Sequence, residues 1–119
     1  MAMPREKDLE VSFLLDFYGE LLDPAKREAA RLYFDEDLSL AEIAQTTGIT
    51  RQGVRDRIEK AKTQLYTYEE KLGLAHKFRE IDSKLDDITA RLKKLSDMSC
   101  GETKDELDRL TEEVGTITI

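Results

Sequence analysis

Apolar residues recur in steps of three and four along most of the chain, which is the spacing of amphipathic helices. One series covers residues 9–22, a second covers 24–34, and a third continues from residue 54 without a stop signal until Gly73. From residue 74 the steps alternate strictly between four and three over three heptads, which is typical of a coiled-coil seam. The seam positions are Leu74, Phe78, Ile81, Leu85, Ile88, Leu92 and Leu95. The pattern predicts an all-α protein.

Residues 38–65 carry the signals of a helix-turn-helix. Ser39 and Glu42 form a capping box for a helix that starts at residue 40, and Gly48 can take the left-handed conformation that ends it. Thr50 is an N-cap for a second helix. Apolar or small residues fall where two helices that cross at a steep angle bury side chains, namely Ile43, Ala44, Ile49, Val54 and Ile58. An ordinary helical hairpin has similar caps and is the alternative interpretation.

The second helix of this motif exposes mainly charged and polar residues. Such a helix fits the major groove of DNA, with its N-terminal residues at the base edges. We therefore predict that bases are contacted by Arg51, Gln52 and Arg55. Phosphate contacts are predicted for Ser39, Thr50, Arg57 and Lys60.

The net charge of −7 argues against a polyanion as partner, but its distribution favours one. Residues 38–65 hold five basic and three acidic residues, a local charge of +2, against −5 in residues 1–37 and −4 in residues 66–119. Binding through so small an excess would be modest and strongly salt-dependent. A second copy of the motif in a dimer would add contacts.

These patterns divide the chain into a helical bundle, residues 1–72, and a C-terminal association segment, residues 73–119. A seam only two positions wide favours self-association over packing on the protein's own core, although a fold-back within the chain stays an alternative. After a polar linker at 96–101, Thr103 and Glu106 form a second capping-box pattern that predicts a last helix of about eleven residues. The charged run at 5–8 predicts a frayed start, and residues 115–119 suit either a strand or an irregular end.

Composition argues against several other classes of function. No apolar run approaches the ~20 residues of a membrane span, and the N-terminus lacks the apolar core of a signal peptide, which predicts a cytoplasmic protein without membrane insertion. Cys100 and His76 are the only residues of their types, so no disulfide within the chain, zinc site of the Cys/His type or cofactor is expected. The sequence has no glycine-rich phosphate loop and no cluster of nucleophile and base, which predicts that it is not an enzyme.

Residues 38–65 resemble the helix-turn-helix in region four of bacterial sigma factors, where Leu-Ser-x-x-Glu-Ile-Ala precedes Gly-Val/Ile-Ser/Thr-Arg and a Val. A narrower resemblance, to the YlxM-type helix-turn-helix proteins of Gram-positive bacteria and mollicutes, rests on four stretches. They are FLLDFYGELL (13–22), LYFDEDLSLAEIA (32–44), GITRQGV (48–54) and YEEKLGL (68–74). The resemblance implies an all-helical dimer whose gene commonly lies beside those for the signal recognition particle GTPase and its receptor. It implies an accessory role in protein targeting, with nucleic acid such as the particle's RNA among the targets.

Two positions depart from the YlxM pattern, which usually has a small residue other than glycine at position 53 and an aromatic residue at position 55. This chain has Gly53 and Arg55. With Arg57, Arg55 makes the exposed helix more basic and more similar to a sigma factor, which favours DNA.

Three functions remain open from the sequence. The first is a dimeric nucleic-acid binder of the targeting pathway, and the second is a sequence-specific DNA-binding regulator. The third is an interaction module that docks on the targeting GTPase without nucleic-acid readout. A helix reads the major groove of B-form DNA, whereas the A-form major groove is too narrow, so RNA would be held through phosphates, loops or bulges.

Overall fold

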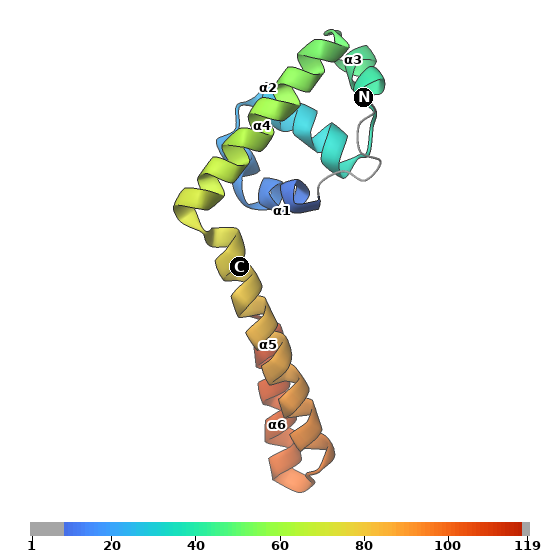
Figure 1. Ribbon diagram of the computed structural model, residues 1–119. Helices are drawn as coiled ribbons and strands as arrows, with labels where there is room; N and C mark the ends of the chain where they lie inside the picture. Colours follow the sequence, from blue (N-terminus) through green and yellow to red (C-terminus); the bar gives the residue numbers. More distant parts are fainter. Residues whose placement is uncertain (1–8, 118–119) are drawn as a thin grey trace. The chain divides into compact units, whose positions relative to one another are not determined.

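The computed structural model describes residues 9–117, which are helical except for the connecting turns and contain no strand (Figure 1). The prediction of an all-α protein is thus confirmed. The chain separates into two compact units, residues 1–75 and residues 76–119. No described helix is long and apolar enough to cross a membrane.

The first unit is built from four helices and two short irregular turns. In chain order they are α1 (Leu9–Tyr18), the 3₁₀ turn η1 (Gly19–Leu21), α2 (Pro24–Ala30), the π-helical turn η2 (Arg31–Asp35), α3 (Leu40–Thr47) and α4 (Arg51–Leu72). Asp23 caps α2 as expected, because its side chain accepts a hydrogen bond from the Lys26 amide at 2.9 Å. The predicted helix over 9–22 instead tightens into η1 after Tyr18. The helix predicted to continue to residue 34 widens into η2, where the Glu36 amide donates to the Arg31 carbonyl at 3.0 Å.

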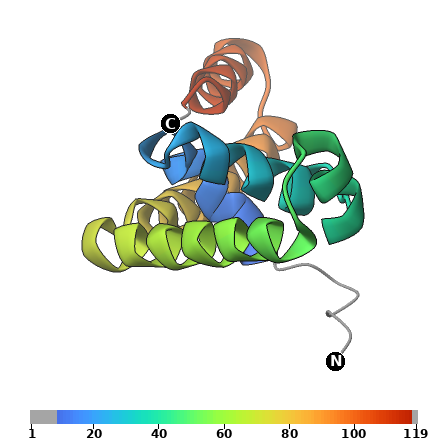
Figure 2. The same cartoon turned by 90° about the horizontal axis from the view of Figure 1, so that it is seen from above.

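Helix α4 is the centre of the first unit, since α1, α2 and α3 all pack against it. Figure 2 shows α3 near the N-terminal end of α4, with α1 and α2 along its remaining length. The core has two clusters that share α2 and α4. One contains Val11, Leu14, Leu15, Tyr18, Leu22, Ala30, Ala61, Leu65 and Ala75. The other contains Ala29, Tyr33, Ile43, Val54 and Ile58.

A buried tyrosine holds the end of this unit together. The Tyr18 hydroxyl donates to Glu69 Oε1 at 2.6 Å and accepts from the Leu74 amide at 3.1 Å. The same Glu69 oxygen accepts from the Ala75 amide at 3.1 Å. Burial and the Glu69 carboxylate raise the pKa of Tyr18 above its usual 10.0. These side chains therefore satisfy the first free amides of the next helix, which would otherwise lack partners.

The second unit is an antiparallel hairpin of α5 (Leu74–Asp97) and α6 (Gly101–Gly115) (Figure 1). Ser96 joins the two helices, because its hydroxyl donates to Asp108 Oδ1 and accepts from Lys104 Nζ at 3.0 Å. Ser96 is only 3% exposed and is the one buried residue among residues 76–117.

Two predicted boundaries in this region are wrong. The polar linker predicted over 96–101 covers only residues 98–100, since α5 continues through Asp97 and α6 already begins at Gly101. Thr103 is therefore no N-cap but lies within the first turn of a helix of 15 residues, and Glu106 pairs with Arg109 at 2.9 Å instead. Gly115 ends α6, while residues 5–8 and 118–119 lie outside the described part of the chain.

Candidate nucleic-acid interface

Helices α3 and α4 form the helix-turn-helix through reciprocal caps. Ser39 Oγ accepts from the Glu42 amide at 3.1 Å, and the Ser39 amide donates to Glu42 Oε1 at 2.9 Å. Gly48 ends α3 with φ 77°, in the left-handed region that glycine enters without a Cβ clash. Thr50 starts α4 by accepting from the Gly53 amide at 2.9 Å. The predicted boundaries of both helices are therefore confirmed.

Buried aliphatic side chains fix the two helices against each other. Ile43 of α3 and Val54 and Ile58 of α4 are almost completely buried, and Ala44 and Ile49 pack against them. Burial of side chains of this size contributes roughly 1.5–3 kcal/mol each relative to exposure. The exposed side of α4 is thus presented on a rigid support.

Gly53 has a local reason to be glycine although it lies inside a helix. A Cβ atom at this position would lie 3.2 Å from Thr50 Oγ1 and 3.5 Å from Ile49 Cδ1. The first distance is tighter than ordinary van der Waals contact, so a larger residue would press on the hydroxyl that caps the helix. Glycine thus preserves the cap at a cost of about 1 kcal/mol in helix propensity.

The three predicted base-contacting residues lie together in the first two turns of α4. Arg51, Gln52 and Arg55 are all exposed. With about 100° of rotation per residue, Arg51 and Arg55 lie some 40° apart around the helix, and Gln52 lies within about 100° of both. The Gln52 amide donates to Asp56 Oδ1 at 3.2 Å, which orients it on the outermost face.

Acidic neighbours moderate the positive charge of this surface. Burial raises the pKa of Tyr33, and the nearby charges of Arg55, Glu59 and Asp37 also act on that phenol, Arg55 in the opposite direction to the two carboxylates. Arg55 and Glu59, which are four residues apart on α4, thus both lie near the Tyr33 side chain. Such a surface attracts phosphate less strongly than the arginine alone would.

The predicted phosphate contacts are more dispersed. Arg57 is half-buried and, like Lys60, lies well over 100° around α4 from Arg55. The hydroxyls of Ser39 and Thr50 accept hydrogen bonds as caps, which leaves each of them a proton to donate to a phosphate oxygen. Arg57 and Lys60 lie about 60° from each other on the far side of α4 from Arg55, while Ser39 lies at the start of α3.

The seam of α5 is only partly covered. Leu74, Ile88 and Leu95 are 51%, 41% and 49% exposed, while Phe78, Ile81, Leu85 and Leu92 are half-buried. Helix α6 lies beside the C-terminal part of α5, so some of the seam packs within the chain (Figure 1). Pairing of the seam with a second chain stays a prediction.

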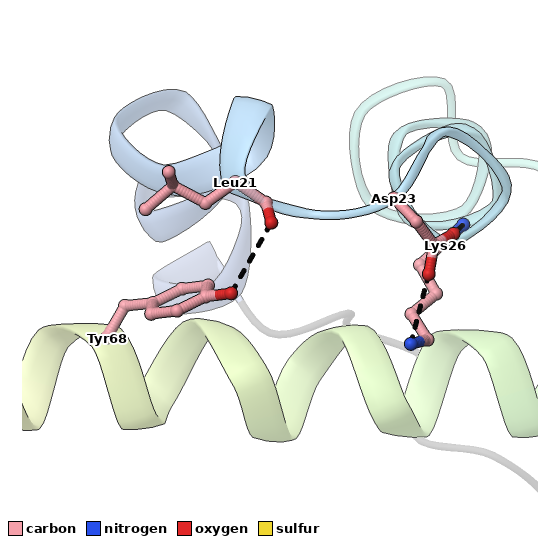
Figure 3. Close-up of polar contacts among 4 residues, drawn as sticks. All are labelled: Leu21, Asp23, Lys26 and Tyr68. Carbon is pink, nitrogen blue, oxygen red and sulfur yellow. Dashed lines mark hydrogen bonds and ion pairs between the residues drawn. The ribbon is translucent and has the colours of Figure 1, made fainter.

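One residue that could contact nucleic acid lies outside α4 and is not indicated by the periodicity of that helix. Lys26 belongs to α2, yet its side chain extends toward α4 (Figure 3) and lines a groove with residues of that helix. The sequence indicates only that Lys26 lies three residues after Asp23, the N-cap of α2. Because the groove unites residues almost forty positions apart, only the packing of α2 on α4 reveals it.

Comparisons with known proteins agree with this geometry. A sequence profile of the UPF0122 family, described as "Putative helix-turn-helix protein, YlxM / p13 like", matches residues 5–106. A UPF0122 protein of Acetivibrio thermocellus is 42% identical over 101 residues, covering 83% of this chain and 86% of that protein. A UPF0122 protein of Clostridium perfringens is 37% identical over 109 residues, covering 92% of this chain and 96% of its own length.

Proposed function

This chain belongs to the UPF0122 family of YlxM / p13-like helix-turn-helix proteins, and on that basis we propose that it is a non-enzymatic regulatory protein of the cytoplasm that binds nucleic acid. The observation that carries the proposal is the second helix of the motif. Its N-terminal turns expose Arg51, Gln52 and Arg55 on a support fixed by caps and a buried core. Duplex DNA is the ligand that this geometry fits, because only the B-form major groove admits a helix.

A charge-reversal variant tests the proposal. Arg51→Glu combined with Arg55→Glu should weaken binding to duplex DNA by roughly a hundredfold or more, since a good bidentate base contact is worth ≈ 1–3 kcal/mol. Fluorescence anisotropy with labelled DNA measures the loss. The matched control is Lys84→Glu with Arg91→Glu, which makes the same change of charge on α5. Unchanged binding by the first variant, or equal losses by both, would refute the proposed interface.

The ligand itself is to be identified by a pull-down from lysate with and without nuclease, read by sequencing and mass spectrometry. The resemblance to YlxM-type proteins makes the signal recognition particle RNA the second nucleic acid to compare with DNA. Recovery of RNA alone, with retention insensitive to Arg51 and Arg55, would replace major-groove readout by contacts with phosphates or loops. Recovery of the targeting GTPase after nuclease treatment would favour the protein-docking function instead.

We further infer that the protein forms a homodimer through the seam on α5. The observation behind this inference is that no apolar side chain of the described hairpin after Ala75 is fully buried, whereas Leu74, Ile88 and Leu95 are about half exposed. Leu85→Asp should halve the mass measured by light scattering, while Lys84→Asp on the exposed side of the same helix should leave it unchanged. An unaltered mass for Leu85→Asp would exclude this seam as the dimer contact.

A further inference from the structure

A groove of about 290 Å³ lies where α2 packs on α4, and most of its residues belong to no contact predicted so far. It is lined by Lys26 of α2 and by Glu59, Lys60, Thr63 and Gln64 of α4. We propose that this groove binds a backbone phosphate of the duplex whose bases meet the N-terminal turns of α4. The inference rests on the proposed function and adds a second point of attachment to it.

The groove offers several hydrogen-bond donors of the kind that phosphate requires. Lys26 Nζ lies 3.0 Å from Asp23 Oδ2, but an ammonium has three N–H donors, so this ion pair does not exhaust it. Lys60 supplies a second ammonium, and Gln64 and Thr63 supply an amide and a hydroxyl. Two ammonium groups and two neutral donors in one groove suit the unesterified oxygens of a phosphodiester.

The position of the groove on α4 matches the edge of a DNA major groove. With about 100° per residue, Thr63 lies within about 20° of both Gln52 and Asp56, while Lys60 lies about 80° around α4 from Gln52, so the groove borders the recognition face through Thr63. The rise of 1.5 Å per residue puts Thr63 about 16 Å beyond Gln52. Because the major groove is ≈ 12 Å wide, a helix whose first turns meet the bases reaches the phosphate backbone at about this distance.

Glu59 belongs to the same groove and opposes an anion. Its carboxylate should weaken the binding of phosphate. Replacing Glu59 should therefore change the affinity in the opposite direction from replacing a lysine. Replacing Glu59 by glutamine removes the repulsion while keeping a side chain of the same size. Affinity for DNA should therefore rise.

The test compares single charge removals by anisotropy with a random-sequence DNA duplex over a range of salt concentrations. Lys26→Gln and Lys60→Gln should each weaken binding several-fold, whatever the sequence, and each should reduce the slope of log K against log salt by about 0.9. Arg27→Gln is the matched control, because Arg27 neighbours Lys26 on α2 but lines a different groove, against α1. Glu59→Gln should tighten binding.

Circular dichroism and melting curves show that each variant is folded. A slope for Lys26→Gln equal to that for Arg27→Gln would overturn the phosphate site, and so would a loss of affinity confined to one sequence. A failure of the proposed function gives different results. The wild-type protein then does not bind DNA, or the charge reversal at Arg51 and Arg55 leaves DNA binding unchanged. Either result would refute the phosphate site as well.

Discussion

The two halves of this chain have equally regular apolar patterns but very different burial. Helix α4 buries Val54, Ile58, Ala61 and Leu65 against three other helices. Helix α5 has an even stricter repeat, yet it buries no apolar residue after Ala75 within the described chain. Periodicity therefore identifies which face of a helix is apolar, whereas the number of neighbouring elements decides how much of that face leaves water.

The difference in burial also predicts that truncating a side chain destabilises the two halves to different extents. A core closed on several sides resists truncation of a side chain, because a cavity remains that the surroundings cannot fill. A two-helix hairpin with half-exposed leucines has no such enclosure and depends more on its polar contacts. Matched substitutions in the two units measure this contrast.

The largest effect is expected for leucine truncation. Leu65→Ala should lower the free energy of unfolding by about 3 kcal/mol, because Leu65 is completely buried in α4. Leu85→Ala should cost about 1 kcal/mol or less at concentrations at which the chain is monomeric, because Leu85 is only half-buried on α5, and more where the proposed dimer forms. Urea denaturation followed by circular dichroism gives both values. Equal losses would show that the hairpin has an enclosed core in solution, as a second chain would create.

The next comparison concerns the side-chain hydrogen bonds made by Tyr18 in the first unit and by Ser96 in the second. Tyr18→Phe should cost about 2 kcal/mol, because it removes the donor to Glu69 and the acceptor for the Leu74 amide. Ser96→Ala should cost about 1 kcal/mol, since its partners Lys104 and Asp108 can regain water. The same denaturation experiment compares them. A larger loss at Ser96 would identify that contact as the main support of the hairpin.

Alkaline pH should weaken the first unit in a way that reports on Tyr18. The pKa of Tyr18 is raised by burial in the folded protein, so its contribution is complete below the unfolded value of 10.0 and declines as pH rises through the folded value. Unfolding measured between about pH 8 and 12 should show this decline, with a smaller slope for Tyr18→Phe. Tyr33, whose pKa is also raised, should keep part of the dependence in that variant. An identical slope in both proteins would contradict the assignment.

Glycine replacement is expected to have a smaller effect. Gly48→Ala should cost about 1–2 kcal/mol, because φ is 77° at the turn of the helix-turn-helix. Gly115→Ala, at the end of α6, should be neutral or raise stability by a few tenths of a kcal/mol, since its φ is not positive and nothing lies within 4 Å of an added Cβ. Melting temperatures rank the two variants. A neutral Gly48→Ala would mean that α3 can end in another way.

The smallest contrast separates two similar capping patterns. Ser39→Ala should cost about 1 kcal/mol, because both bonds of the capping box with Glu42 are formed. Thr103→Ala should change stability by at most about 0.5 kcal/mol, and in the stabilising direction, because Thr103 lies inside α6 where alanine is the better helix former. Thermal unfolding resolves the difference in sign. A comparable loss at Thr103 would show that α6 starts later in solution.

Much of the helix-turn-helix was predictable because its signals are local. Ser39 and Glu42, Gly48, and Thr50 with Gly53 form caps and a turn through atoms at most a few residues apart, so the residue types alone specify them. The same local rule failed at Thr103, because α6 begins at Gly101, two residues before it, with Cys100 at the N-cap position. A capping pattern thus does not by itself fix the residue at which a helix begins.

The sequence by itself determined the all-α class, the caps and turn of the helix-turn-helix, and the apolar face of each long helix. Only the tertiary structure decided that α4 buries its face while α5 leaves three of its seven seam residues exposed, and that Lys26 of α2 shares a groove with Lys60 and Thr63 of α4. The physical reason is range: a cap or a periodic face depends on atoms within one or two helical turns. Burial and shared grooves depend on which distant segments pack together.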